Sequence, residues 1–128
     1  MLDSLVLKET GFKIRLSRPP HYIDKIPDGH TSYDAYRYMN YQYLAASFDA
    51  GGWKPSKGSY KQDVREMTDL IERALMEDPD ILNGQIIFQK DGCNMSLQTP
   101  VAGALDESLR LLTDAGYKVV TASELIER

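Results

Sequence analysis

Apolar and polar positions follow one another along this chain in patterns that predict short strands and longer helices. Residues 84–92 (GQIIFQKDG) hold three successive apolar residues that give way to polar ones before a glycine. A short apolar run bounded by turn signals is typical of a strand buried on both faces. Residues 12–17 alternate apolar and polar, which predicts a strand with one buried face. Further strands are predicted at residues 43–48 and 117–120, with a weaker candidate at residues 5–7.

Helix start signals separate these predicted strands. Thr31 or Ser32 is expected to cap a short helix that runs to about Met39. The string SYKQ at residues 59–62 is a capping box, and the helix it begins is expected to end at Asp78-Pro79. A second capping box, TASE at residues 121–124, predicts a closing helix.

One more helix is predicted from about residue 101 to residue 115. Its apolar residues recur at helical spacing, so four of them are expected to face inward: Val101, Leu105, Leu109 and Leu112. Gly116 is the expected stop, because glycine adopts the left-handed backbone that ends many helices.

Strand and helix thus alternate about four times with short connections, which predicts an α/β fold with mainly parallel strands. A complete (β/α) barrel needs about 250 residues, so four such units in 128 residues make an open sheet or about half a barrel. No linker or repeat divides the chain, and residues 1–128 are expected to form a single domain. An open half-barrel exposes strand edges, so we expect a larger polypeptide, a homodimer or the chain's own loops to cover them.

Composition narrows the classes of partner. The 42% hydrophobic and 27% charged residues are typical of a globular protein. A net charge of -4 without a basic block disfavours nucleic acid, and no apolar run reaches the roughly 20 residues that span a bilayer. The first residues lack the basic start of a signal peptide, which leaves the localisation open. Cys93 is the only cysteine, so an internal disulfide and a cysteine-based zinc cluster are excluded.

Four segments in order resemble the polysaccharide deacetylase family. Arg18-Pro19-Pro20-His21 is similar to its R-x-P-Y turn, and residues 47–53 (SFDAGGW) are similar to its D-x-x-D-W stretch. Residues 84–92 resemble its G-x-I-I-L-x-H-D-G strand, and residues 116–125 (GYKVVTASEL) resemble its closing segment. Together they cover about residues 11–127. The resemblance implies the carboxyl-terminal half of a distorted (β/α) barrel.

In that family a divalent cation, usually zinc, assists hydrolysis of N- or O-acetyl groups on a sugar polymer. The resemblance therefore implies an acetylated polysaccharide or oligosaccharide as the partner. The family's base and metal ligands come from T-F-D-D-G and H-S/T-x-x-H strings in its amino-terminal half. This chain has no T-F-D-D-G string, and residues 30–34 (HTSYD) fit a relaxed second string only on the wrong side of the Arg-Pro-Pro turn. We expect no metal or other cofactor, and no catalysis, in this chain alone.

Three residues stand at positions that are catalytic in the family. Arg18 matches an arginine that pairs with the catalytic aspartate, and Asp49 matches the first Asp of D-x-x-D-W, whose second Asp is replaced here by Gly52. Gln89, or Lys90 one residue on, stands in line with the catalytic histidine. Glutamine has no proton that titrates near neutral pH, so it can orient a substrate amide but cannot act as an acid. The alternative roles are structural: Arg18 satisfying loop carbonyls, and Gln89 holding the neighbouring loop.

Three more residues are candidates for substrate binding. His21 stands where the family has tyrosine, and Asp91 follows the apolar strand predicted within residues 84–92. Trp53 offers an indole on which a pyranose can pack. The structural alternatives for His21 and Asp91 are an exposed loop histidine and a loop-capping carboxylate. The chain is therefore read either as a deacetylase-like domain that is inactive alone, or as a non-catalytic carbohydrate-binding or self-associating module.

Overall fold

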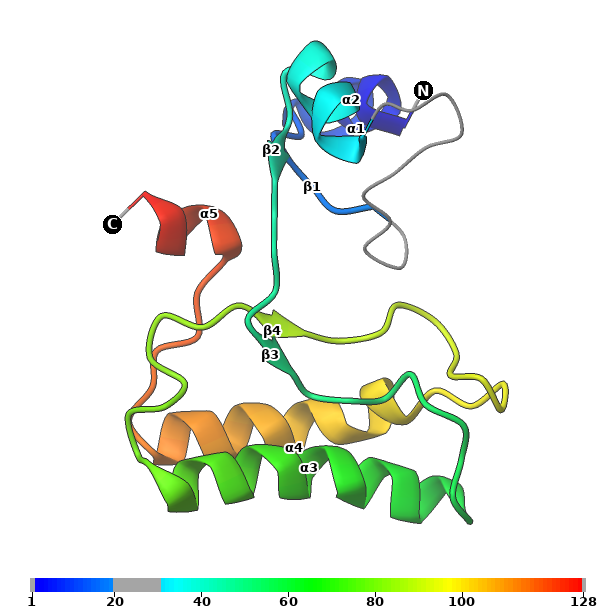
Figure 1. The fold of residues 1–128 in the computed structure, drawn as a ribbon, viewed down its shortest axis with the longest axis vertical. Coiled ribbons are helices and arrows are strands. Elements are labelled where there is room, and N and C mark those ends of the chain that lie inside the picture. The colour runs from blue at the N-terminus through cyan, green and yellow to red at the C-terminus, as the bar shows by residue number, and fades with distance from the viewer. Residues whose placement is uncertain (1, 20–30, 128) are drawn as a thin grey trace. The chain divides into compact units, whose positions relative to one another are not determined.

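The computed structural model describes residues 2–19 and 31–127, which form two compact units (Figure 1). Unit 1 is Met1–Ala45 and unit 2 is Ala46–Arg128. Helices make up most of the regular structure, and each strand has only two residues. Both strand pairs are parallel, as the sequence predicts, so the chain has mixed helix and strand of the α/β kind. The described residues form no closed barrel.

The described residues of unit 1 form two helices and one strand pair. Its elements in order are α1 (Leu2–Thr10), β1 (Leu16–Ser17), α2 (Ser32–Met39) and β2 (Gln42–Tyr43). Strands β1 and β2 run parallel, with Leu16 opposite Gln42. Tyr43 packs its ring against Tyr33 and Tyr36 of α2, with centroids 4.7 and 5.9 Å away. These three rings therefore pack α2 onto β2.

Helix α2 begins where the sequence predicts. The Thr31 hydroxyl accepts a hydrogen bond from the Asp34 amide (3.3 Å), and the Asp34 carboxylate accepts one from the Thr31 amide (2.9 Å). This reciprocal pair satisfies two amides that a helix start leaves without partners. The helix ends at Asn40, whose left-handed φ of 58° is typical of a helix end.

Two strand predictions in unit 1 are wrong or only partly right. Residues 5–7 lie inside α1, because the surrounding residues favour a helix and a three-residue apolar run fits either structure. Of residues 12–17 only Leu16 and Ser17 pair as a strand. Phe12 is 64% exposed, so its alternating pattern does not correspond to a buried sheet face.

Unit 2 packs one strand pair on two long helices (Figure 1). Its elements are β3 (Phe48–Asp49), α3 (Tyr60–Glu77), β4 (Ile87–Phe88), α4 (Pro100–Asp114) and α5 (Ala122–Ile126). Strands β3 and β4 are parallel, with Phe48 opposite Ile87 and Asp49 opposite Phe88. The buried core comprises Ile71, Ala74, Leu82 and Leu112, with Phe48 and Ile87 packed against it.

The predicted inward face of α4 is right only in part: Leu112 is buried and Val101 is half buried. The buried positions of α4 after its first residue are Ala104, Ser108 and Leu112, whereas Leu105 and Leu109 are exposed. Ala104 and Ser108, which both have small side chains, take the place of larger leucines in the buried stripe of α4, and α4 packs along α3 (Figure 1). Gly103 belongs to the same contact, because a Cβ there would lie 2.8 Å from Val64 and collide with the Tyr60 hydroxyl.

The remaining strand predictions also need correction. Residues 43–48 form no single strand, since β2 ends at Tyr43 and β3 begins at Phe48. Ile87 and Phe88 are only half buried, so β4 is not covered on both faces. Residues 117–120 form no strand: the Tyr117 hydroxyl donates to the Pro79 carbonyl (2.5 Å) and accepts from the Leu82 amide (3.2 Å). The segment is thus held by one side chain instead of by backbone pairing.

Within the described ranges, no helix combines the length and the apolar character needed to cross a membrane.

Candidate functional site

Polar residues follow both strands of unit 2 at one edge. Asp49 is the last residue of β3, and Gln89 comes directly after β4. The two strands are parallel neighbours, and the Ala50 amide continues the ladder by donating to the Phe88 carbonyl (3.3 Å). The structure therefore brings two residues singled out from the sequence, Asp49 and Gln89, to the carboxyl ends of neighbouring parallel strands, which is where α/β folds bind ligands.

Asp49 orients Trp53 through its carboxylate. Oδ1 of Asp49 accepts a hydrogen bond from the Gly51 amide (2.8 Å), and Oδ2 accepts one from the indole Nε1 of Trp53 (2.9 Å). The Trp53 carbonyl accepts from the Met95 amide (3.3 Å), so backbone and side chain are both tied down. Trp53 is nevertheless 37% exposed. We call this Asp49–Trp53 pair the strand-end site.

Lys54 lies over the indole of the strand-end site. Its Nζ is 5.4 Å from the Trp53 ring centroid, within the range of a cation–π contact. Such a contact at an exposed position contributes about 0.5–1 kcal/mol, so a ligand that stacks on this face can displace the lysine at modest cost. The indole is thus fixed in direction and remains accessible.

The alternation of side chains places Asp49 on the face away from the helices. Phe48 and Ile87 are register partners and both pack on the α3–α4 core. Because successive strand residues point to opposite faces, Asp49 and Phe88 point away from that core. An extended chain that continues past Phe88 places Lys90, not Gln89, on this same face. The Lys90 Nζ donates to the Asp91 carbonyl (2.8 Å).

The loop after β3 has room only for glycine at position 52. Gly51 and Gly52 have φ of 76° and 82°, in the left-handed region that glycine favours. A Cβ at position 52 would lie 2.7 Å from Val101 Cγ2 and 2.8 Å from Met67 Sδ. The second Asp of the D-x-x-D-W pattern therefore does not fit this backbone.

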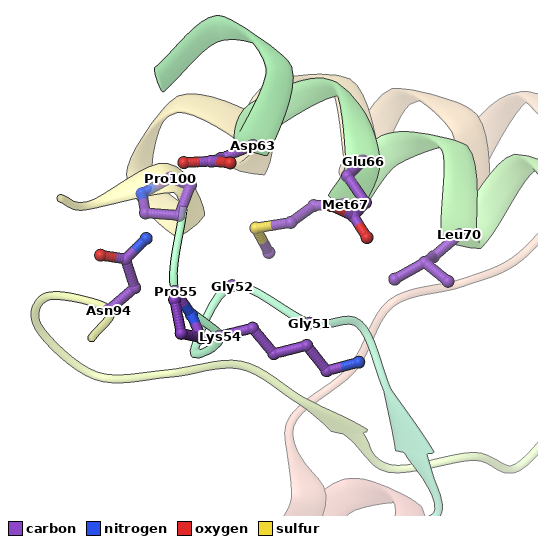
Figure 2. Close-up of a pocket in the computed structure, with 10 residues that line it drawn as sticks. All are labelled: Gly51, Gly52, Lys54, Pro55, Asp63, Glu66, Met67, Leu70, Asn94 and Pro100. Atoms are coloured by element: carbon purple, nitrogen blue, oxygen red, sulfur yellow. The ribbon is translucent and has the colours of Figure 1, made fainter. Parts of the chain in front are cut away.

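A small cavity lies beside this loop, against the first turns of α3 (Figure 2). We call it the α3 cavity. About 30 Å³ of it is open to the centres of water-sized molecules, which is room for about two waters. The residues that line it are Gly51, Gly52, Lys54, Pro55, Asp63, Glu66, Met67, Leu70, Asn94 and Pro100.

Two buried polar residues of the α3 cavity escape the sequence patterns. Asp63 is only 8% exposed, and its Oδ2 has no hydrogen-bond partner among the described residues. Asn94 is buried as well, and its Oδ1 accepts from the Ser96 and Gln98 amides at 2.9 and 3.0 Å. In the sequence, Asp63 looks like an ordinary acidic residue in the first turn of a helix, and Asn94 looks like an ordinary loop residue. Only their burial in the structure distinguishes them from other residues of these kinds.

The other sequence-predicted residues lie elsewhere. Arg18 belongs to unit 1, where its Nε donates a hydrogen bond to the Leu44 carbonyl at 2.7 Å. This contact is of the type expected if Arg18 satisfies backbone carbonyls of a loop. His21 lies outside the described residues, as does His30. Asp91 is exposed in the loop after β4, close in sequence to the exposed thiol of Cys93.

Metal ligands do not gather in the part of the chain that the structure describes. In residues 2–19 and 31–127 no three His, Cys, Asp or Glu side chains are grouped closely enough to hold a metal ion. The side chains present at the strand-end site and in the α3 cavity offer hydrogen bonds and one aromatic face.

Comparison with known proteins adds no relative. No protein-family model, no curated protein and no solved structure matches this chain.

Proposed function

We propose that this chain is a deacetylase-like domain that binds acetylated carbohydrate at the strand-end site and does not release acetate by itself. The observation that carries the proposal is the hydrogen bond from Trp53 Nε1 to Asp49 Oδ2. It links the two residues that match the D-x-x-D-W pattern, at the carboxyl end of parallel strands. The half-barrel architecture is part of the same proposal, supported by the parallel pairing of β3 with β4 and the helices on one face.

Binding is supported by the fixed orientation of the indole. An aromatic side chain that is already held loses little freedom when a ligand stacks on it, so more of the contact free energy appears as affinity. A pyranose presents an apolar face of C–H groups to such a ring, and its hydroxyls can remain in water. Trp53 is also the only tryptophan of the chain.

The chemistry of the strand-end site argues against catalysis by this chain alone. Both carboxylate oxygens of Asp49 already accept hydrogen bonds from Gly51 and Trp53, which leaves this group poorly placed to take a proton from water. Gln89 carries no acidic proton near neutral pH. If an amino-terminal half with the family's metal ligands accompanies this domain, the complete protein would be a metal-dependent carbohydrate esterase.

Fluorescence titration tests binding directly, because all tryptophan emission comes from Trp53. Acetylated chito-oligosaccharides are expected to change the emission in a saturable way. Asp49→Asn should weaken binding about threefold to tenfold. The asparagine has a single acceptor oxygen, so it cannot accept from both the Gly51 amide and the Trp53 indole as the two carboxylate oxygens do. Asp106→Asn, on the exposed side of α4, is the matched control and should bind like the wild type. A flat wild-type titration would refute the binding proposal.

An acetate-release assay tests the second half of the proposal. The wild-type chain is incubated with acetylated chito-oligosaccharides and with zinc, nickel or cobalt. We expect no turnover above the metal-free blank. Turnover that depends on added metal would show that this chain is a complete catalyst.

A second candidate function is self-association through unit 1. Helix α1 exposes three leucine side chains, Leu2, Leu5 and Leu7. A group of exposed apolar side chains often marks a protein–protein contact surface. Sedimentation velocity over a range of concentrations separates the two candidates. A concentration-dependent dimer that Leu5→Glu abolishes would favour self-association, whereas a strict monomer would remove it.

A further inference from the structure

We propose that the α3 cavity is a subsite for one hydroxymethyl arm of the bound carbohydrate, with Asp63 as acceptor and Asn94 as donor. The inference rests on the proposed function and extends it from the indole to a second, buried contact. Lys54 connects the two places, because it follows Trp53 in sequence and also lines the cavity.

Asp63 supplies a buried acceptor that the protein does not satisfy. Its Oδ1 accepts from the Lys57 amide at 3.3 Å, whereas its Oδ2 has no partner among the described residues. A buried carboxylate oxygen without a donor is costly, so such an atom at a cavity wall indicates that a donor arrives from outside. The position of Asp63 in the first turn of α3 stabilises its negative charge through the helix dipole.

Asn94 supplies a donor at the same end of the cavity. Its Oδ1 is already used by the Ser96 and Gln98 amides, which fixes the amide so that Nδ2 is left for a ligand. In the view of Figure 2, Asp63, Pro100 and Asn94 lie at one end of the cavity and Leu70 lies at the other. The Asn94 nitrogen points toward the Pro100 ring in this view.

An acceptor and a donor together suit a group that both donates and accepts, and in so small a cavity a hydroxyl does this with a single oxygen. A hydroxyl donates to Asp63 Oδ2 and accepts from Asn94 Nδ2, whereas an ammonium group has no lone pair for the asparagine. A carboxylate or phosphate would meet the negative charge of Asp63. Glu66, which also lines the cavity, has its Oε1 paired with Lys57 Nζ at 2.7 Å.

The size and the walls of the cavity fit a short arm and exclude a whole sugar ring. Room for about two waters accommodates a CH₂OH group, which has two heavy atoms. Met67, Leu70 and Pro55 provide apolar walls for the methylene. The remainder of the carbohydrate would lie outside, over the loop that carries Trp53.

Nuclear magnetic resonance of the wild-type chain tests the subsite without any substitution. An acetylated chito-oligosaccharide and its 6-deoxy counterpart, which lacks the hydroxyl of the arm, are titrated separately. We expect the parent sugar to shift the side-chain amide signals of Asn94 and the backbone amide of Lys57, saturating together with the change in Trp53 emission. The 6-deoxy sugar should bind at least about tenfold more weakly, as for the loss of a hydrogen bond to a buried charged acceptor.

Substitution gives the second measurement. Asp63→Asn should weaken the parent sugar about tenfold and leave the 6-deoxy sugar unchanged, because only the parent uses the carboxylate. Asp69→Asn, in an exposed ion pair on the same helix, is the matched control and should change neither affinity. Far-UV circular dichroism establishes that both variants keep the helical content of the wild type.

The outcomes separate the subsite from the strand-end site. If Trp53 responds to both sugars equally and the Asn94 signals do not move, the carbohydrate stacks on the indole alone and the cavity holds only water; the subsite is then refuted while the proposed function stands. If neither reporter responds, both proposals fail together. If Trp53 responds, the Asn94 signals move and the 6-deoxy sugar is discriminated, both proposals stand; if the Asn94 signals move without any Trp53 response, the strand-end site is refuted, and with it the subsite as an extension of that site.

Discussion

At the scale of single residues, Gly52 sets the limits of the strand-end site. Its backbone has a φ of 82°, and the space that a side chain would need is filled by Val101 and Met67. Val101 is stiff at its Cβ, whereas Met67 can turn its terminal methyl aside. The crowding around Gly52 gives a physical reason why this loop does not hold the second aspartate of the D-x-x-D-W pattern.

Replacement of Gly52 by alanine should destabilise the fold more than the same change at Gly84. Gly84 also has a positive φ, of 71°, but its added Cβ would meet nothing within 4 Å. Gly84→Ala is expected to cost about 1 kcal/mol of unfolding free energy, and Gly52→Ala about 1–3 kcal/mol more. Urea unfolding followed by circular dichroism measures both. Equal losses would mean that the crowding around Gly52 relaxes freely.

Arg110 offers a test of surface electrostatics at the same scale. Its guanidinium bonds the Glu107 carboxylate at 2.5 Å and Asp114 at 2.7 Å, and the hydrogen bond to Arg110 lowers the pKa of Glu107 below its ordinary range. A carboxyl with a lowered pKa contributes stability that is present above its unfolded pKa and lost as the pH falls through the folded value.

Carbon-detected titration of the Glu107 carboxyl group should show this directly. In Arg110→Ala the pKa of Glu107 is expected to rise toward the ordinary value for glutamate, because the main cause of its shift is removed. Arg65→Ala, which breaks an ion pair on α3 instead, is the control and should leave the Glu107 titration unchanged. A pKa of Glu107 that stays low without Arg110 would show that another group lowers it.

At the scale of elements, the contact of α3 with α4 holds unit 2 together. Ser108 lies in the buried stripe of α4 between Ala104 and Leu112, and its hydroxyl has no partner among the described residues. Alanine at this position would keep the side chain small and would remove only the hydroxyl.

Ser108→Ala should therefore stabilise the chain. Removing a buried hydroxyl without a partner is expected to raise the unfolding free energy by about 1 kcal/mol. Ser123→Ala, at an exposed position of α5, is the matched control and should change it much less. A destabilised Ser108→Ala variant would mean that the hydroxyl finds a partner in solution.

Helix starts could be predicted from the sequence because their causes are local. The capping boxes at Thr31, Ser59 and Thr121 are all present, each confined to four consecutive residues. Strands were harder, because pairing needs a partner far along the chain: residues 117–120 have the composition of a strand but are tied by the Tyr117 hydroxyl. The sequence singled out Asp49 and Trp53 separately but did not predict the hydrogen bond between their side chains. The burial of Asp63 and Asn94 depends on tertiary packing and leaves no local pattern.

At the scale of the whole molecule, the division into two units bears on the prediction of a single domain. The buried core cluster of Ile71, Ala74, Leu82 and Leu112 lies entirely in unit 2, which also carries the strand-end site and the α3 cavity. Unit 1 is Met1–Ala45, and a chain this short buries too little surface to form a stable core easily by itself.

A fragment of residues 46–128 is expected to fold alone. It should keep the helical circular dichroism of α3 and α4 and unfold in one cooperative transition, whereas a fragment of residues 1–45 should melt without cooperativity. If the larger fragment is unfolded, the whole chain is one cooperative domain, as the sequence suggests.

The hydrogen bond between Asp49 and Trp53 gives this protein a built-in optical reporter. Local opening of the β3–β4 edge would release the only indole into water and shift its emission to longer wavelength, while α3 and α4 keep their ellipticity. Emission and ellipticity recorded along the same melt would coincide if the edge and the helices open as one unit. If emission changes first, the edge frays before the helices, and ligand binding there should delay that first step.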